Sequence, residues 1–214
     1  EIKNNDIVVF NWPADTVRKF FVKEKGVIKP RDKKSNYVKR ALGIPGDTIE
    51  IKDGIIFING KKNVLPDRAK PIFTYNIRSE KGVSSNKLKE IGIEGFIRKF
   101  IIKNLTPRSY EEISNYILSI SNTNDNEYLV YTDDSGIPLS IIRDNNITIS
   151  ELIDSTREIS LTYEDAFKIE NSNLFDTIYR VTQSKGVSNL NFFPNNNNFK
   201  WNNDYLGPIY IPKK

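Results

Sequence analysis

The sequence predicts a mainly β core that is interrupted by an α+β insertion. Short β-branched runs joined by sharp turn signals fill the first 62 residues, polar tracts with helical spacing follow, and aromatic residues mixed with prolines close the chain. We therefore expect three segments: residues 1–64 as the first part of the core, 65–190 as the insertion, and 191–214 as the return to the core.

The first segment reads as strands separated by turns. A short apolar run at residues 7–10 predicts one strand, and residues 36–42, after a charged loop, predict a second. The Gly-Ile-Pro-Gly-Asp cluster at 43–47 predicts a turn, because proline fixes φ and glycine allows positive φ. Asp53-Gly54, between β-branched runs at 48–51 and 55–58, predicts a tight hairpin, and Asn59-Gly60 predicts another turn.

The insertion carries weaker signals of both kinds. Residues 109–119 predict a helix with a serine cap and two glutamates in its first turn, and residues 150–159 and 163–170 are weaker helix predictions. Residues 128–132 and 177–182 predict strands. After residue 190, a short strand is expected at 207–212, between two prolines.

Charge argues against a nucleic-acid partner. The chain of 214 residues has a net charge of +5, with 32 basic and 27 acidic residues that alternate along most of its length. A nucleic-acid binder concentrates its basic residues on one stripe. The nearest approach to one is a cluster that we interpret as a solvated loop, with an anionic membrane surface as the second reading: Lys23, Lys25, Lys29, Arg31, Lys33 and Lys34.

Residue types that are absent restrict the chemistry. Without cysteine or histidine, the chain has no disulfide, no zinc site of the usual kinds, no cysteine nucleophile and no histidine base. We expect no metal and no cofactor. A Ser-Lys dyad is then the natural arrangement for hydrolysis. No apolar run approaches the roughly 20 residues of a membrane span, and a first residue Glu1 with no methionine suggests an excised fragment.

Lys39 is the candidate base. In a strand, alternate side chains share a face, so Lys39 is expected beside Tyr37 and Ala41, with Val38 and Arg40 on the opposite face. An aromatic ring and a methyl group would partly desolvate the ammonium group. Desolvation favours the neutral amine, which a lysine needs before it can accept a proton from a serine hydroxyl.

The motifs around Lys39 resemble those of a known family. Asn-Asp-Ile-Val-Val-Phe at 5–10, Tyr-Val-Lys-Arg at 37–40 and Gly-Ile-Pro-Gly-Asp at 43–47, followed by Ile-Lys-Asp-Gly and Ile-Asn-Gly, resemble two consecutive boxes of bacterial type I signal peptidases. Leu-Pro-Asp-Arg-Ala-Lys at 65–70 and the closing residues 201–212 resemble the long-insertion enzymes of Bacteroidetes-type bacteria. The resemblance covers residues 1–76 and 189–214, and residues 85–160 resemble nothing that we can name.

The resemblance implies a fold, an activity and site residues. The core would be the signal-peptidase and LexA-like β fold, and the function a serine endopeptidase that removes signal peptides from exported precursor proteins. It would act on the periplasmic side of the cytoplasmic membrane, with the membrane surface as a further partner. Lys39 matches the general base, Tyr37 and Val38 border the substrate groove, and Arg40 and Asp47 support the site.

The nucleophile is unknown and is expected outside this chain. The family's serine, in a Ser-x-x-Pro-Thr setting, should lie upstream of residue 1, and its Gly-Asp-Asn-Arg box downstream of residue 214. Ser35 lies four residues from Lys39, which is about 13 Å along a strand and too far for proton transfer. Ser84 and Ser85 match no nucleophile motif, so we expect the fragment alone to be inactive.

Simpler interpretations of these residues, and other functions of the chain, stay open. Tyr37 and Val38 could be ordinary half-buried strand residues, and Trp12 and Trp201 could be either core residues or membrane-interface anchors. At the level of function, one alternative is a non-catalytic peptide-binding or scaffold protein that keeps the fold. Another is a relative that shares the fold but cleaves itself or a single partner, as repressor-type Ser-Lys proteases do.

Overall fold

The computed structural model describes residues 1–12, 26, 28–124, 126–192 and 194–213. The chain forms two compact units, the first made of Glu1–Ala69 and Thr182–Lys214 and the second of Lys70–Val181. Lys23 and Lys25 of the predicted basic loop lie outside the described residues. The second unit is shorter at both ends than the insertion predicted at 65–190.

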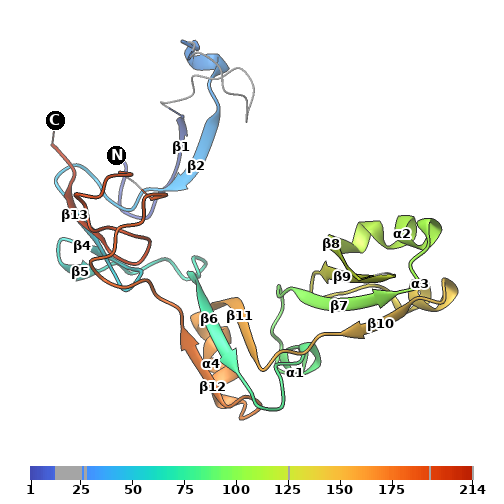
Figure 1. The fold of residues 1–214 in the computed structure, drawn as a ribbon. Helices are drawn as coiled ribbons and strands as arrows, with labels where there is room; N and C mark the ends of the chain where they lie inside the picture. The colour runs from blue at the N-terminus through green and yellow to red at the C-terminus, as the bar shows by residue number, and fades with distance from the viewer. Residues whose placement is uncertain (13–25, 27, 125, 193, 214) are drawn as a thin grey trace. The chain divides into compact units, whose positions relative to one another are not determined.

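The first unit contains a two-stranded ribbon. Strand β1 (Ile7–Asn11) pairs antiparallel with β2 (Asn36–Arg40), in a register that sets Val8 opposite Lys39 (Figure 1). The pairing continues one residue beyond β2, where the Ala41 amide donates a hydrogen bond to the Asp6 carbonyl at 2.8 Å. A short 3-10 helix, Arg31–Lys33, precedes β2.

The same unit holds a four-stranded antiparallel sheet in the order β13-β3-β4-β5. Its strands are β3 (Thr48–Lys52), β4 (Ile55–Ile58), β5 (Lys61–Lys62) and β13 (Leu206–Tyr210). The turn residues Asp53 and Gly54 have φ of 50° and 65°, and Asn59 and Gly60 have φ of 53° and 77°. Two successive positive φ values are the mark of type I′ hairpins, so both predicted turns are confirmed.

The second unit contains a three-stranded sheet in the order β11-β6-β12. These strands are β6 (Ile72–Arg78), β11 (Thr156–Thr162) and β12 (Thr177–Arg180), and α4 (Tyr163–Asn171) packs on the sheet (Figure 1). Helix α1 (Ser85–Glu90) adds Leu88 to the same core. The buried members of this core are Tyr75, Ile77, Val83, Leu88, Ile93, Phe96, Ile159, Leu161, Ala166 and Ile169.

A second sheet of this unit has the order β10-β7-β9-β8. Its strands are β7 (Arg98–Lys103), β8 (Ile117–Asn124), β9 (Glu127–Thr132) and β10 (Thr148–Glu151). Helices α2 (Pro107–Ile113) and α3 (Leu139–Asp144) pack against it around a core of Phe100, Ile102, Ile113, Val130, Ile137 and Ile147. A 3-10 turn, Ser114–Tyr116, joins α2 to β8.

Two helix predictions need correction. The prediction of a helix at residues 150–159 is wrong: residues 150–151 end β10, residues 152–155 connect the strands, and residues 156–159 begin β11. In β11 the buried Ile159 and Leu161 alternate with more exposed residues, which is the period of a strand. The predicted helix 109–119 begins at Pro107, is capped by Thr106 and ends at Ile113; the 3-10 turn Ser114–Tyr116 follows, and from Ile117 on the chain pairs with β9. The helix predicted at 163–170 and the strands at 128–132 and 177–182 are confirmed.

The predicted fold class is confirmed. Of the residues that the structure describes, strands account for 35% and helices for 17%, in several antiparallel sheets, so the described part of the chain is mainly β. None of the helices in the described part of the chain is long and apolar enough to cross a membrane.

Candidate active site

Lys39 projects from the two-stranded ribbon into solvent. Its Nζ lies over the ring of Tyr37, 5.8 Å from the ring centroid, and its side chain is exposed. Among the described residues it forms no hydrogen bond or ion pair. The sequence leads us to expect partial desolvation of this amine. The described residues do not bury it, because a two-stranded ribbon alone is too small to enclose the side chains that project from it.

The face of the ribbon that carries Lys39 is aromatic. Tyr37 stacks with Phe10 across the strand pair at a centroid distance of 6.3 Å, and the ring of Trp12 lies 5.0 Å from that of Tyr37. Trp12 thus packs against the candidate site while remaining 41% exposed. Lys39 therefore lies over one ring of a cluster of three aromatic side chains.

The opposite face of the ribbon is aliphatic and exposed. Val9 and Val38 are cross-strand partners. Ile7 lies two residues before Val9 in β1 and so projects from the same face. The three side chains are 68%, 61% and 68% exposed, respectively. Tyr37 and Val38, which are predicted to border the substrate groove, lie on opposite faces of one strand, as the alternation of side chains along a strand leads us to expect.

Arg40 is bonded to the segment that leads into β1. Its Nη1 donates a hydrogen bond to the Asn5 carbonyl at 2.6 Å, and the Asn5 amide donates to the Ala41 carbonyl at 2.6 Å. Asn5 has a φ of 73°, which turns the chain before the strand begins. Arg40 therefore fixes where β1 meets β2.

Asp47 gathers three donors at the turn after β2. Its carboxylate accepts hydrogen bonds from Asn4 Nδ2 at 2.9 Å, the Ile44 amide at 3.0 Å and Asn59 Nδ2 at 2.7 Å. The hydrogen bond from Asn4 is the main reason that the pKa of Asp47 lies below its ordinary value, and the other two add to it. Asn4 also donates to the Leu42 carbonyl at 2.9 Å. Asp47 thus ties the start of the chain to two turns.

The turn itself is joined to the closing strand. The Gly46 amide donates to the Ile211 carbonyl, and the Ile211 amide donates to the Asp47 carbonyl, each at 2.8 Å. A Cβ at Gly43 would lie 2.5 Å from Ile49 Cδ1 and 2.6 Å from Ile211 Cδ1. Glycine at position 43 therefore allows the turn to close on the sheet.

Of the five predicted site residues, Val38 lies on the aliphatic face, and the other four fall into two groups. Tyr37 and Lys39 contact each other on the aromatic face, whereas Arg40 and Asp47 hold the residues that bring β1 to β2, and neither is hydrogen-bonded to Lys39 in the described part of the chain. Sequence reasoning missed Asn4 as a partner of Asp47. An asparagine just before an apolar run does not by itself indicate a hydrogen-bond partner, and the partner of Asn4, Asp47, lies 43 positions further along the chain.

No group of three or more acidic, cysteine or histidine side chains lies close enough to hold a metal ion within the described ranges. The chemistry available at this site is that of an exposed primary amine beside aromatic rings, next to strands with free edges. β1 and β2 pair only with each other among the strands that the structure describes.

Comparisons with known proteins identify similar proteins of one family. Residues 1–107, half of the chain, match the family described as signal peptidase, peptidase S26. Signal peptidase I P of Bacillus subtilis subsp. natto is 35% identical over 66 residues, which are 31% of this chain and 33% of that protein. Signal peptidase IB of Staphylococcus aureus (strain N315) is 38% identical over 61 residues, 28% of this chain and 29% of that protein.

The chain thus spans a third or less of the length of these relatives. No solved structure matches it. Because the family match covers the ribbon, the Asp47 turn and the hairpins that follow, the chain belongs to the signal peptidase family, peptidase S26.

Proposed function

We propose that this chain is part of a serine endopeptidase that removes signal peptides from exported proteins. The observation that carries the proposal is the position of Lys39. It is an exposed lysine beside an aromatic ring, on a ribbon whose two strands pair only with each other among the described strands, in a chain that has no histidine to act as a base. The family match over residues 1–107 supports the same activity.

Lys39 is the general base in this proposal. A serine outside residues 1–214 attacks the scissile carbonyl while its hydroxyl proton passes to the neutral Lys39 amine, and the resulting ammonium then protonates the leaving amine. Substrate and the segment carrying the serine would cover the exposed amine and so favour its neutral form. Tyr37 holds the lysine stem in place, and Arg40 and Asp47 position the ribbon.

An extended signal-peptide segment would pair with a free edge of the ribbon. Such β-augmentation gives affinity through backbone hydrogen bonds and leaves selection to the side chains on either face. Tyr37 would then contact substrate side chains on one face of the paired strands, and Val38 would contact those on the other face. The two contribute from opposite faces of β2, which suits a substrate whose own side chains alternate.

The site of action in this proposal is the periplasmic side of the cytoplasmic membrane, with precursor proteins as partners. The exposed apolar side chains of Ile7, Val9 and Val38, together with Trp12, support contact with a bilayer interface, which favours aliphatic and indole groups. No nucleic-acid partner is proposed.

Cleavage of an exported precursor by the full-length protein tests the proposal. Lys39→Ala should lower the rate by about 10² to 10⁴-fold, the usual contribution of a general base, and Lys39→Arg should fail equally because guanidinium keeps its proton. Lys52→Ala is the matched control, since Lys52 also lies over a ring, 5.4 Å from the centroid of Phe57 on the neighbouring sheet. It should cleave at the wild-type rate.

Two results would contradict the proposal. Wild-type cleavage by Lys39→Ala, with circular dichroism showing an intact fold, would exclude Lys39 as the base. An intact precursor after incubation with the wild-type full-length protein would favour a non-catalytic scaffold or a protein that cleaves only itself.

A further inference from the structure

The second unit has a pocket that the proposed protease activity does not use. It is a cavity of about 430 Å³ lined by the loop before α2, by α2 itself and by strands β8 and β9. That volume lies within the range of small-ligand sites, which is roughly 300–1,000 Å³. None of its lining residues carries a charge.

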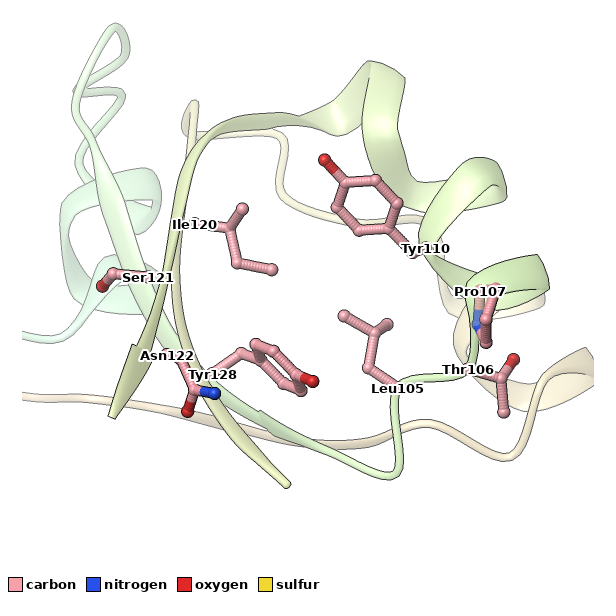
Figure 2. A pocket seen from close by; sticks show the side chains of 8 residues that line it. All are labelled: Leu105, Thr106, Pro107, Tyr110, Ile120, Ser121, Asn122 and Tyr128. Atoms are coloured by element: carbon pink, nitrogen blue, oxygen red, sulfur yellow. The ribbon is translucent and has the colours of Figure 1, made fainter. Parts of the chain in front are cut away.

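The pocket has an apolar interior and a polar rim. Leu105, Tyr110, Ile120 and Tyr128 point into the cavity (Figure 2), and Leu105, Ile120 and Tyr128 also pack against the core beneath. The side-chain amide of Asn122 and the two tyrosine hydroxyls form no hydrogen bond with the residues that the structure describes. An apolar side chain would therefore find aliphatic and aromatic contacts, and polar groups would be available around it.

The strand at this pocket is an exposed sheet edge. β8 pairs with β9 on one side, and no described strand pairs with its other side. Ser121 lines the pocket although its side chain points away from it (Figure 2), so the strand meets the cavity through its backbone. Between the irregularities at 117–119 and 122–124, residues 119–122 keep a regular register, and alternate residues direct their N–H and C=O groups outward.

This edge lacks most of the usual protection against pairing. Natural edge strands are commonly short or carry lysine or proline. β5, the edge of the other unit's sheet, is two lysines long, whereas β8 is eight residues long and has neither charge nor proline. A long neutral edge next to an apolar pocket matches an extended polypeptide, whose backbone pairs with the strand and whose side chain enters the pocket.

We propose that β8 and this pocket bind an extended, uncharged polypeptide segment, with one aromatic or aliphatic side chain in the cavity. The uncharged lining selects a neutral segment, since a buried charge would find no partner there. This binding site is separate from the candidate active site, and its test does not depend on proteolysis.

The test is binding of a defined peptide to chain 1–214, followed by nuclear magnetic resonance of the labelled protein. The probe is the blocked peptide acetyl-Thr-Ser-Thr-Phe-Thr-Ser-Thr-amide. We expect shift changes confined to residues 105–110, 117–122 and 128. Replacing the central Phe by Glu should abolish these shift changes. Two further peptides carry N-methyl groups on alternate backbone nitrogens, one on each of the two alternating sets. Only the peptide whose methyl groups block the N–H groups that face β8 should fail to bind.

Two tyrosine variants provide a matched comparison. Tyr110 and Tyr116 are 42% and 40% exposed and lie close together in sequence, but only Tyr110 lines the pocket. Tyr110→Ala should weaken binding about tenfold, which corresponds to roughly 1.4 kcal/mol for one lost aromatic contact, and Tyr116→Ala should leave Kd unchanged.

Any of four outcomes would overturn the proposal. These are no binding of the probe, equal loss in both tyrosine variants, full binding by both methylated peptides, and self-association of the chain that Tyr110→Ala abolishes. The last would assign the edge to a second copy of the chain rather than to a neutral peptide.

Discussion

Three donors converge on the carboxylate of Asp47 from different parts of the first unit: Asn4 at the start of the chain, Ile44 in the turn, and Asn59 at the end of β4. Each donor favours the ionised carboxylate, so the folded state binds a proton there less readily than the unfolded chain. Asp47 and Arg40 together hold the residues from which β1 starts, and thereby the strand opposite Lys39.

Asp47 should make stability depend on pH. Because its pKa is lower in the folded state, its contribution is complete above its ordinary value of about 3.8 and is lost as the pH falls through the lower folded value. Urea unfolding of chain 1–214 should show Asp47→Asn less stable than wild type at pH 6. The difference should shrink at pH 3 and below.

The exposed Asp67 provides the control, since no hydrogen bond or ion pair ties it to the described residues. Asp67→Asn should match wild type at both pH values. A difference between Asp47→Asn and wild type that stays constant down to pH 2 would show that the three hydrogen bonds do not favour the ionised carboxylate.

At the level of elements, the pairing of β13 with β3 joins the end of the chain to its beginning. Leu206 pairs with Ile51 and Ile209 with Ile49, and an irregularity lies between them at Gly207. Gly207 has a φ of +93°, and a Cβ there would lie 2.6 Å from the Ile49 carbonyl oxygen. The strand can approach β3 this closely only without a side chain at this position.

Gly207→Ala should therefore destabilise the first unit more than the same change at Gly186. Gly186 also has a positive φ, +83°, but nothing lies within 4 Å of a Cβ built on it. Both variants bear the backbone strain, and only Gly207→Ala adds a clash with backbone, worth about 1–3 kcal/mol. Unfolding free energies measure the difference, and equal values would show that β13 can move away at no cost.

A second element-level feature is the polar cluster that joins β7, β10 and α1. Glu151 accepts hydrogen bonds from Arg98 Nη2 at 2.8 Å and from Ser85 Oγ, and its side chain and that of Arg98 are each 17% exposed. Burial alone raises the pKa of Glu151. The hydrogen bonds from Arg98 and Ser85 and the charges of Arg98 and Arg157 outweigh it and bring the pKa below its ordinary value.

Removing the Glu151 carboxylate should leave a half-buried arginine without its acceptor. We expect Glu151→Ala to lower the free energy of unfolding by about 2 kcal/mol or more. Asp154→Ala is the control, because Asp154 pairs with Lys99 at 2.9 Å with both side chains about half exposed, and such pairs contribute roughly 0–1 kcal/mol. Equal effects in chemical denaturation would show that burial adds nothing to the Glu151 pair.

At the level of the whole molecule, the two units differ in how much apolar surface they bury. Every buried hydrophobic residue among those described lies between Tyr75 and Ile169, in the second unit. In the first unit the ribbon instead exposes Ile7, Val9 and Val38. Since apolar burial is the main favourable contribution to folding, the second unit should be the more stable of the two in chain 1–214.

Hydrogen exchange of chain 1–214 should show this difference directly. Backbone amides of β6, β7 and β9 should exchange at least about tenfold more slowly than those of β1 and β2, because the latter open without exposing a buried core. Equal protection of the two groups would mean that the ribbon is held by contacts other than apolar burial.

The sequence by itself determined the features that depend on neighbours along the chain. Asp-Gly and Asn-Gly specified their hairpins because few other residues adopt positive φ, and the spacing of Tyr37 and Lys39 on one strand placed them on one face. The ordered motifs from residue 5 to residue 60 were sufficient to indicate the family, which the match over residues 1–107 then showed.

Tertiary structure decided what depends on partners far away in sequence. Residues 150–151 and 156–159 form strands because the neighbouring strands β7 and β6 supply backbone partners, which a local helical pattern cannot reveal. The exposure of Lys39 and the convergence of Asn4 and Asn59 on Asp47 were equally hidden. The physical reason is the same in each case: burial and hydrogen bonding across tens of residues are set when the sheets assemble, and no short stretch of sequence encodes them.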